Sequence, residues 1–297
     1  MVDLLRGYEA VKEGFAAVDP RRDVLRAWGP QAESFLQGQI SQDIARLAAG
    51  ESAWSLVLAP AGRVDAMVRV TRIAPDEFVI DTDGGWGQAV LVRLSRFKLR
   101  TKIDFEALDW MAVGLRGPAV VAPAPSAGAP VVADASWPGL VGVDLLGPAP
   151  EVPEGAVEVE RAAYEAARIE AGVPVMGAEL TERTIPAEAG LVGRTVSFTK
   201  GCYTGQELVA RIDSRGSHVA RHLRGLRLDA AVDVGAPVVV GGKEVGRVTS
   251  VAQSPALGWV ALGYVGRAVE PGATVSAGDG VTATVHTLPL SEPGQSR

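Results

Sequence analysis

The sequence has a single cysteine, Cys202, and only three histidines among its 297 residues. One thiol cannot form an internal disulfide, and by itself it cannot hold an iron–sulfur cluster or a structural zinc ion, since each needs about four ligands. His218 and His222 have the i, i+4 spacing of a helix face, but Gly216 just before them favours a loop leading into a strand. We therefore expect no resident metal, and a lone thiol is typical of a reducing compartment.

Long apolar runs and an excess of positive charge are also missing. No stretch approaches the roughly 20 apolar residues of a membrane-spanning helix, and the start lacks the basic-then-apolar order of a secretory signal. The formal net charge is −6, which argues against broad nucleic-acid binding because such binding depends on neutralising phosphates. These features favour a cytoplasmic, globular protein without membrane contact.

The first hundred residues predict strands that alternate with two amphipathic helices. Gly29-Pro30 opens the first helix, because proline is tolerated at the first helical position. The second helix follows the glycine-rich turn at residues 84–87 and has Val90 and Leu94 on one face. Strands are expected at residues 22–28, 53–58, 63–73 and 78–81.

The rest of the chain predicts a joint, a helix and a barrel. Residues 117–155 are rich in Pro, Ala and Gly, with strand-like pieces at 119–121 and 140–143. A helix is expected at residues 157–171, ending at Gly172. After about residue 225, short strands separated by glycine turns favour a small β-barrel. The fold class is therefore α+β, with antiparallel sheets, flanking helices and a C-terminal barrel, in parts of residues 1–110, 111–218 and 219–297.

The strongest local motif surrounds Cys202. Thr204 and Glu207 form the S/T-x-x-E pattern of a capping box, which predicts Thr204 as the first cap of a helix. Cys202 then lies two residues before a helix N-terminus, where free amides favour negative charge. Lys200 adds a cation, and both effects stabilise the reactive thiolate. The alternative is a buried, inert cysteine, the usual state of a lone thiol.

Other candidate residues break the local charge pattern. Glu170 falls in the last turn of its expected helix, where the helix dipole disfavours a carboxylate by roughly 0.3–1 kcal/mol. Such an exception favours a functional role, although idle glutamates at helix ends are common. Two basic islands are either solvated surface or a local attraction for an anionic ligand; they contain Arg93, Arg96, Lys98, Arg100 and Lys102, and Arg211, Arg215, Arg221, Arg224 and Arg227.

Together these segments resemble a known family. Residues 200–207, with Arg211 and Arg215-Gly216 after them, resemble the signature of YgfZ-type proteins, a branch of the glycine-cleavage aminomethyltransferase superfamily. Further resemblance extends over most of the chain, at residues 35–44, 62–69, 168–188, 246–250 and 258–265. The cysteine motif is specific to the branch, whereas the other stretches fit the whole superfamily.

The resemblance implies an α+β body around a central folate channel. Glu170 matches the superfamily's glutamate that hydrogen-bonds the pterin ring, and a carboxylate suits the paired N–H donors of that ring. Asp65 falls where aminomethyltransferases have two adjacent aspartates, but Ala66 replaces the second one. That replacement argues against aminomethyl transfer. The branch is known for supporting iron–sulfur enzymes, including tRNA-modifying ones, through tetrahydrofolate.

Three hypotheses follow. The first is a tetrahydrofolate-binding protein that assembles or repairs iron–sulfur enzymes, with Cys202 and Lys200 as the catalytic candidates. The second is a folate-dependent one-carbon transferase, and the third is a folate-gated scaffold without catalysis. The expected folate contacts are Glu170, Asp65, Tyr203, Arg211 and Arg215, the two arginines holding the anionic glutamate tail. The expected partners are iron–sulfur client or assembly proteins.

Overall fold

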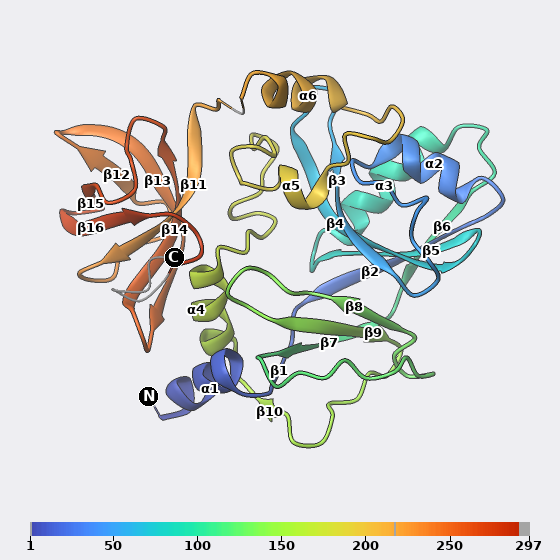
Figure 1. Cartoon of the computed structure of the whole chain (residues 1–297), viewed down its shortest axis with the longest axis horizontal. Coiled ribbons are helices and arrows are strands. Elements are labelled where there is room, and N and C mark those ends of the chain that lie inside the picture. Colours follow the sequence, from blue (N-terminus) through green and yellow to red (C-terminus); the bar gives the residue numbers. More distant parts are fainter. Residues whose placement is uncertain (1, 217, 291–297) are drawn as a thin grey trace.

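The computed structural model describes residues 2–216 and 218–290, which form three units around a common centre (Figure 1). Two of the units are five-stranded sheets, and the third is a closed barrel. Helices and loops fill the space between them. This arrangement confirms the predicted α+β class with a C-terminal barrel.

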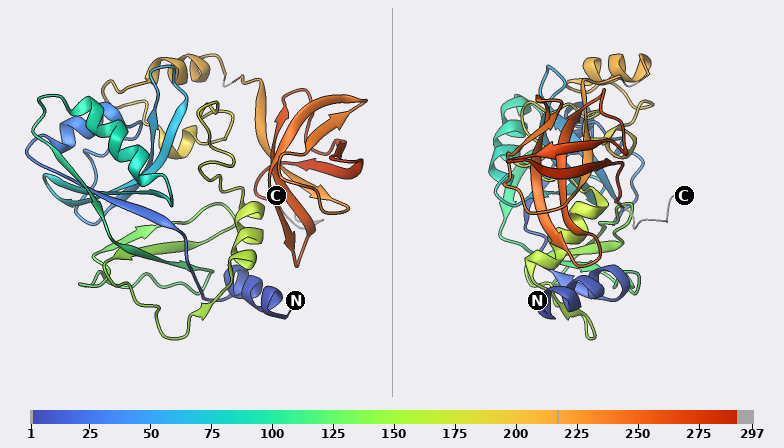
Figure 2. Two further views of the ribbon diagram at one scale, coloured as in Figure 1. Left: turned by 180° about the vertical axis from the view of Figure 1, so that it is seen from behind. Right: turned by 90° about the vertical axis from the view of Figure 1, so that its left-hand side faces the viewer.

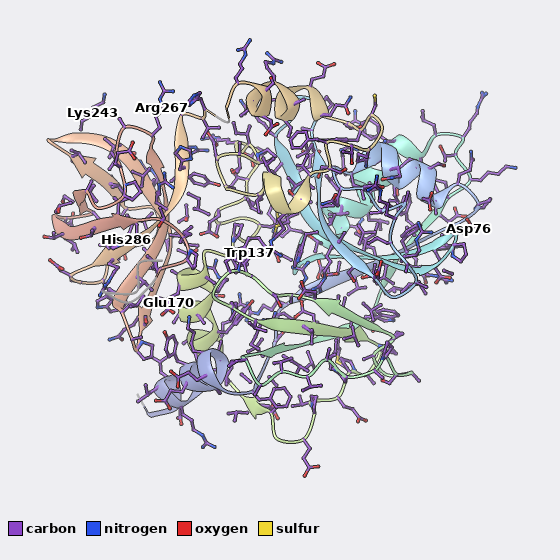
Figure 3. All side chains as sticks on the ribbon, in the orientation of Figure 1. Asp76, Trp137, Glu170, Lys243, Arg267 and His286 are labelled. Atoms are coloured by element: carbon purple, nitrogen blue, oxygen red, sulfur yellow. The ribbon has the colours of Figure 1, made fainter. Side chains whose placement is uncertain are left out.

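The first unit is a sheet with strand order β3-β4-β5-β2-β6. Its elements are β2 (Arg22–Trp28), α2 (Ala32–Gln39), β3 (Ser52–Leu58), β4 (Val64–Ala74), β5 (Glu77–Asp83), α3 (Gly87–Lys98) and β6 (Asp104–Leu108). All strand pairs are antiparallel, and the tight β4–β5 turn has Asp76 at its tip (Figure 3). Phe78, Ile80 and Leu94 are fully or almost fully buried and belong to the main core. The strands expected here are confirmed. Both expected helices are present too, but the first begins at Ala32 and not at Gly29-Pro30.

The second unit combines the start of the chain with its middle. Its elements are α1 (Val2–Glu13), β1 (Ala16–Val18), β7 (Met111–Arg116), β8 (Val131–Asp134), β9 (Gly142–Gly147), β10 (Val157–Glu158) and α4 (Arg161–Ala171), and the sheet order is β10-β1-β7-β9-β8. The strand expected at residues 119–121 is wrong, because this proline-rich segment is irregular. The expected helix 157–171 starts four residues later, since residues 157 and 158 pair with β1.

The third unit is the barrel, with strand order β11-β14-β13-β12-β15-β16 (Figure 2). Two short helices, α5 (Val192–Thr195) and α6 (Gln206–Ser214), precede it, and its strands are β11 (Arg221–Leu228), β12 (Pro237–Val240), β13 (Lys243–Ser254), β14 (Gly258–Gly266), β15 (Thr274–Ala277) and β16 (Val281–His286). Alternating residues such as Leu226, Ala261 and Val285 fill its interior. Across the described residues, no helix has the length and apolar character needed to cross a membrane.

Helix α4 joins the barrel to the second unit. Gly172 ends it in the left-handed conformation with φ 73°, as predicted. Gly7 of α1 lies so close that a Cβ there would be 3.0 Å from the Cβ of Ala163. On the opposite side, Arg168 donates to Ser250 of β13 at 3.0 Å. The helix is therefore clamped between α1 and the barrel, and its remaining face lies toward the centre of the molecule.

Candidate functional site in the central pocket

A pocket of about 190 Å³ lies where both sheets meet α4. The first sheet contributes its lining through β2, β3, β4 and β5, the second through β7 and β9, and α4 contributes three side chains. The lining residues include Arg22, Trp54, Met67, Asp83, Arg116, Trp137, Leu140, Asp144, Tyr164, Arg168 and Met176. Because the first and second units each supply part of the lining, the pocket exists only when the two have assembled.

Two tryptophans face each other across this pocket. The indoles of Trp54 and Trp137 make an edge-to-face contact, with ring centroids 6.5 Å apart and planes at 86°. Trp54 is held on its sheet by the guanidinium groups of Arg22 and Arg69, which lie 5.3 and 5.0 Å from its ring centroid. Trp137 lies near the centre of the molecule, next to α4 (Figure 3). Aromatic walls of this kind suit a flat, conjugated ligand.

A buried ionic network lies behind the aromatic wall. Arg69 is fully buried and bridges the sheets, because it contacts Asp81 of β5 at 3.0 Å and Asp144 of β9 at 2.9 Å. Arg116 contacts Asp144 at 2.7 Å, and Arg22 contacts Asp81 at 2.7 Å. Burial alone would raise the pKa of Asp144, but Arg116, Arg69 and Arg22 outweigh it and hold that pKa at about 2. The Asp144 carboxylate therefore remains ionised and fixes the guanidinium groups of Arg69 and Arg116 in place.

Some donors on the pocket-lining residues are left unused. Arg22 Nη2, Arg116 Nε and Trp54 Nε1 are buried and have no hydrogen-bond partner among the described residues. Burial would lower the pKa of both arginines, but neighbouring aspartates outweigh it and raise each pKa above its ordinary value, so both stay charged. A buried donor without a partner costs roughly 1–3 kcal/mol. This donor set fits a bound molecule that presents hydrogen-bond acceptors.

The carboxylate of Glu170 lies outside this pocket. It faces α1 and the barrel (Figure 3), where Tyr8 donates to both of its oxygens at 2.9 Å and Ser254 donates at 2.5 Å. Lys12 lies 3.1 Å away. These donors come from α1 and β13. They offset the unfavourable interaction of the Glu170 carboxylate with the dipole at the C-terminal end of α4. The structure does not test the contact between Glu170 and folate that the resemblance implies.

The Cys202 motif is folded onto the first unit. Cys202 itself is exposed. Lys200 Nζ donates to the carbonyl oxygens of Ile40 at 2.8 Å and Gln42 at 3.0 Å. Burial lowers the pKa of Lys200 to about 8, and Asp43 offsets only part of that effect. Lys200 therefore anchors the loop that displays the thiol.

The predicted capping box is wrong. Helix α6 begins after Gly205, which has φ 81° and makes no side-chain cap. Thr204 Oγ1 lies 3.5 Å from the carbonyl oxygen of Gly38 instead, and Gln206 accepts a hydrogen bond from the Tyr203 amide at 3.2 Å. The left-handed glycine shifts the helix start by one residue, so the spacing that suggested Thr204 and Glu207 no longer applies.

The other predicted folate contacts do not lie at one place in the structure. Asp65 accepts from Arg93 Nε at 3.0 Å and lines a separate groove of about 560 Å³ between α3 and the β3–β4 turn. Tyr203 is buried in the main core, and burial raises its pKa. Arg211 on α6 and Arg215 just after it are exposed and make no ion pair within the described ranges. The structure thus brings Cys202, Lys200 and Tyr203 together but leaves Glu170 and Asp65 elsewhere.

The pocket residues were not found by sequence reasoning. Trp54, Trp137 and Tyr164 come from three elements that are far apart in the chain. The signal for Trp137 in the sequence was weak. This residue belongs to the turn Trp137-Pro138-Gly139-Leu140, within a proline-rich stretch that predicted only a linker with edge strands. No group of three or more metal-ligating side chains occurs in the part of the chain that the structure covers.

Comparisons with known proteins agree with this geometry. Residues 221–291 match the glycine cleavage T-protein C-terminal barrel domain. The solved structure of the glycine cleavage system aminomethyltransferase T from Bartonella henselae superposes with a TM-score of 0.81 at 24% identity, covering 97% of this chain and 90% of that chain. The fold is therefore that of the aminomethyltransferases of glycine cleavage, and the barrel matches the C-terminal domain of this class of proteins.

Two relatives narrow this class. The tRNA-modifying protein YgfZ of Klebsiella pneumoniae is 28% identical over 220 residues, which are 64% of this chain and 64% of the relative. A mitochondrial iron–sulfur cluster assembly factor IBA57 homolog of Neurospora crassa is 28% identical over 229 residues, 69% of this chain and 52% of the relative. The chain therefore spans less than two thirds of either protein. With the motif at residues 200–207, these findings support a YgfZ-type member of the superfamily.

Proposed function

We propose that the protein binds a reduced folate in the central pocket and supports the assembly or repair of iron–sulfur enzymes. The observation that carries the proposal is the donor set of the pocket. Arg22 Nη2, Arg116 Nε and Trp54 Nε1 are buried without partners on residues that line one small space between aromatic walls. A folate has flat rings for the walls, and carbonyl and carboxylate oxygens for the donors.

Each pocket residue has a role in this proposal. Trp54 and Tyr164 pack against the flat part of the ligand, while the guanidinium groups of Arg22 and Arg116 donate to its oxygens. Asp144 holds Arg116 in position through their 2.7 Å contact. When bound, the folate supplies a carrier for one-carbon units. The protein's own part is to orient that ligand and exclude water from the buried side of the pocket.

Cys202 is the group that we propose acts on the iron–sulfur client. Its exposure allows contact with a partner, and the Lys200 anchor fixes the loop on which it stands. A single thiolate can attack an electrophile or provide one ligand to a cluster that the partner also binds. The names of the two relatives, a tRNA-modifying protein and an iron–sulfur cluster assembly factor, support this choice of partner.

The folate site is tested by calorimetric titration with 5-formyltetrahydrofolate, a chemically stable reduced folate. Trp54→Phe removes the indole N–H and keeps an aromatic ring, so we expect binding to weaken roughly threefold to tenfold, the effect of one hydrogen bond. Trp28→Phe, on β2 outside the pocket lining, is the control and should bind like wild type. Equal binding by the Trp54→Phe variant and wild type would remove Trp54 from the site.

A further inference from the structure

The central pocket is small as it stands. Its volume of about 190 Å³ is below the roughly 300–1,000 Å³ of sites that enclose a drug-sized ligand. The contact between the Trp54 and Trp137 indoles occupies the space between the two sheets. A conjugated ring that stacks between these walls therefore has to separate the two tryptophans.

Trp137 is the partner that can move. Trp54 is held by two guanidinium groups, including that of fully buried Arg69. Trp137 instead belongs to a short hairpin beyond β8, closed by reciprocal backbone hydrogen bonds between Trp137 and Leu140 at 2.7 and 2.8 Å. Ser136 supports this hairpin through Gly142, with hydrogen bonds of 3.1 and 3.2 Å. The hairpin is therefore held together by its own hydrogen bonds.

Arg194 of α5 latches this hairpin from outside the pocket. Its guanidinium carbon lies 4.2 Å from the centroid of the Trp137 ring, and its Nη1 donates to the carbonyl oxygen of Ser136 at 3.0 Å. Lys12 adds a long hydrogen bond of 3.4 Å to the carbonyl oxygen of Gly139 at the tip. Displacement of Trp137 by a ligand would therefore break the contact with Arg194 first.

The same arginine is connected to the Cys202 loop. Gln42 Nε2 donates to the carbonyl oxygen of Arg194 at 3.2 Å. The carbonyl oxygen of Gln42 in turn accepts from Lys200 Nζ at 3.0 Å, two residues before Cys202. An unbroken series of contacts thus runs from Trp137 through Arg194, Gln42 and Lys200 to the thiol loop.

We infer that the Trp137 hairpin is a ligand-operated latch that connects the central pocket to Cys202. A ring that enters the pocket displaces Trp137 from Arg194, and the loosened α5 releases Gln42 and with it the anchor of the Cys202 loop. The inference rests on the proposed folate site, and it assigns to that site control over the thiol. Energetic coupling between two sites requires an element with two arrangements that both sites bias, and the hairpin is that element.

Two measurements test the latch, both with 5-formyltetrahydrofolate and the full chain. In stopped-flow binding, Arg194→Gln should raise the association rate roughly two- to fivefold, the effect of losing one cation–π contact. Arg26→Gln is the matched control, because it removes a similar contact with Trp28 at 4.8 Å, on a residue outside the pocket lining. Equal association rates for wild type and Arg194→Gln, with both variants folded, would overturn the latch.

The second measurement is the alkylation rate of Cys202 by iodoacetamide, with and without the folate. We expect the bound folate to accelerate alkylation roughly two- to fivefold in wild type, at the low end of allosteric coupling. Gln42→Ala should bind the folate normally but lose this acceleration. If wild type binds the folate and alkylation stays unchanged, the latch is wrong while the folate site stands. If wild type binds no folate, the proposed function fails and the latch fails with it.

Discussion

Replacing Glu170 by glutamine tests whether this residue holds the fold together or holds the ligand. Its carboxylate is almost fully buried and accepts from Tyr8 and Ser254, with Lys12 3.1 Å away. Glutamine has almost the same shape but turns two charge-assisted hydrogen bonds into neutral ones, each weaker by about 1 kcal/mol. Loss of the partly exposed Lys12 pair adds up to about 1 kcal/mol. We therefore expect a loss of roughly 2–3 kcal/mol, because the link between α1, α4 and the barrel is weakened.

The assay is thermal unfolding followed by circular dichroism, together with folate titration of the same variant. In a chain of this length, a loss of this size should lower the melting temperature by roughly 3–5 °C, while folate affinity stays within about twofold of wild type. Glu182→Gln is the control, since Glu182 is exposed and makes no ion pair among the residues described. An unchanged melting temperature with tenfold weaker folate binding would refute this reasoning and make Glu170 a ligand contact, as the family resemblance implies.

Three further predictions concern the Cys202 loop. Cys202→Ala should melt like wild type and bind folate, since the side chain is exposed, but should fail to restore iron–sulfur enzyme activity in deficient cells; full restoration would contradict its proposed role. Reductive methylation of Lys200, followed by mass spectrometry, should reach half its maximal rate near pH 8, whereas a lysine in a peptide does so near pH 10.4. Because the pKa of Lys200 is lower in the folded state than in the unfolded state, the free energy of unfolding should also rise as the pH rises between these two values. Gly205→Ala should lower the free energy of unfolding in urea by roughly 2–4 kcal/mol, because φ is 81° and a Cβ would lie 2.5 Å from the Ala59 carbonyl oxygen. Gly201→Ala is the control and should be nearly neutral, since a Cβ there would have nothing within 4 Å. Equal losses for both variants would rule out the close approach as the cause.

Local signals predicted much of the fold. Strand–turn spacing after residue 225 predicted the barrel because short strands and glycine turns determine its shape locally. The end of α4 at Gly172 was equally predictable from the sequence, since the left-handed conformation at a helix C-terminus favours glycine. Helix α1 was missed, and with it the three contacts from α1 and β13 that explain the position of Glu170. Those contacts join residues about 80 and 160 positions apart, which no local pattern reports.

The central pocket could not be predicted for the same reason. Trp54, Trp137 and Tyr164 face one another only after two sheets and a helix have assembled. The Cys202 motif was visible because its residues are adjacent in sequence, yet its details depended on one backbone conformation, that of Gly205. A capping pattern read from spacing assumes that the helix starts at the hydroxyl residue, and a left-handed glycine one position later changes the start.

The central claim, that the pocket between the two sheets and α4 holds a reduced folate, is tested most directly by hydrogen exchange. Backbone exchange is compared by mass spectrometry with and without 5-formyltetrahydrofolate, over the peptides that cover residues 54–67 and 161–176. We expect slower exchange in both peptides on binding, because they form two walls of the pocket. Slower exchange confined to α6, around Arg211 and Arg215, would contradict the claim and place the ligand on the surface of that helix.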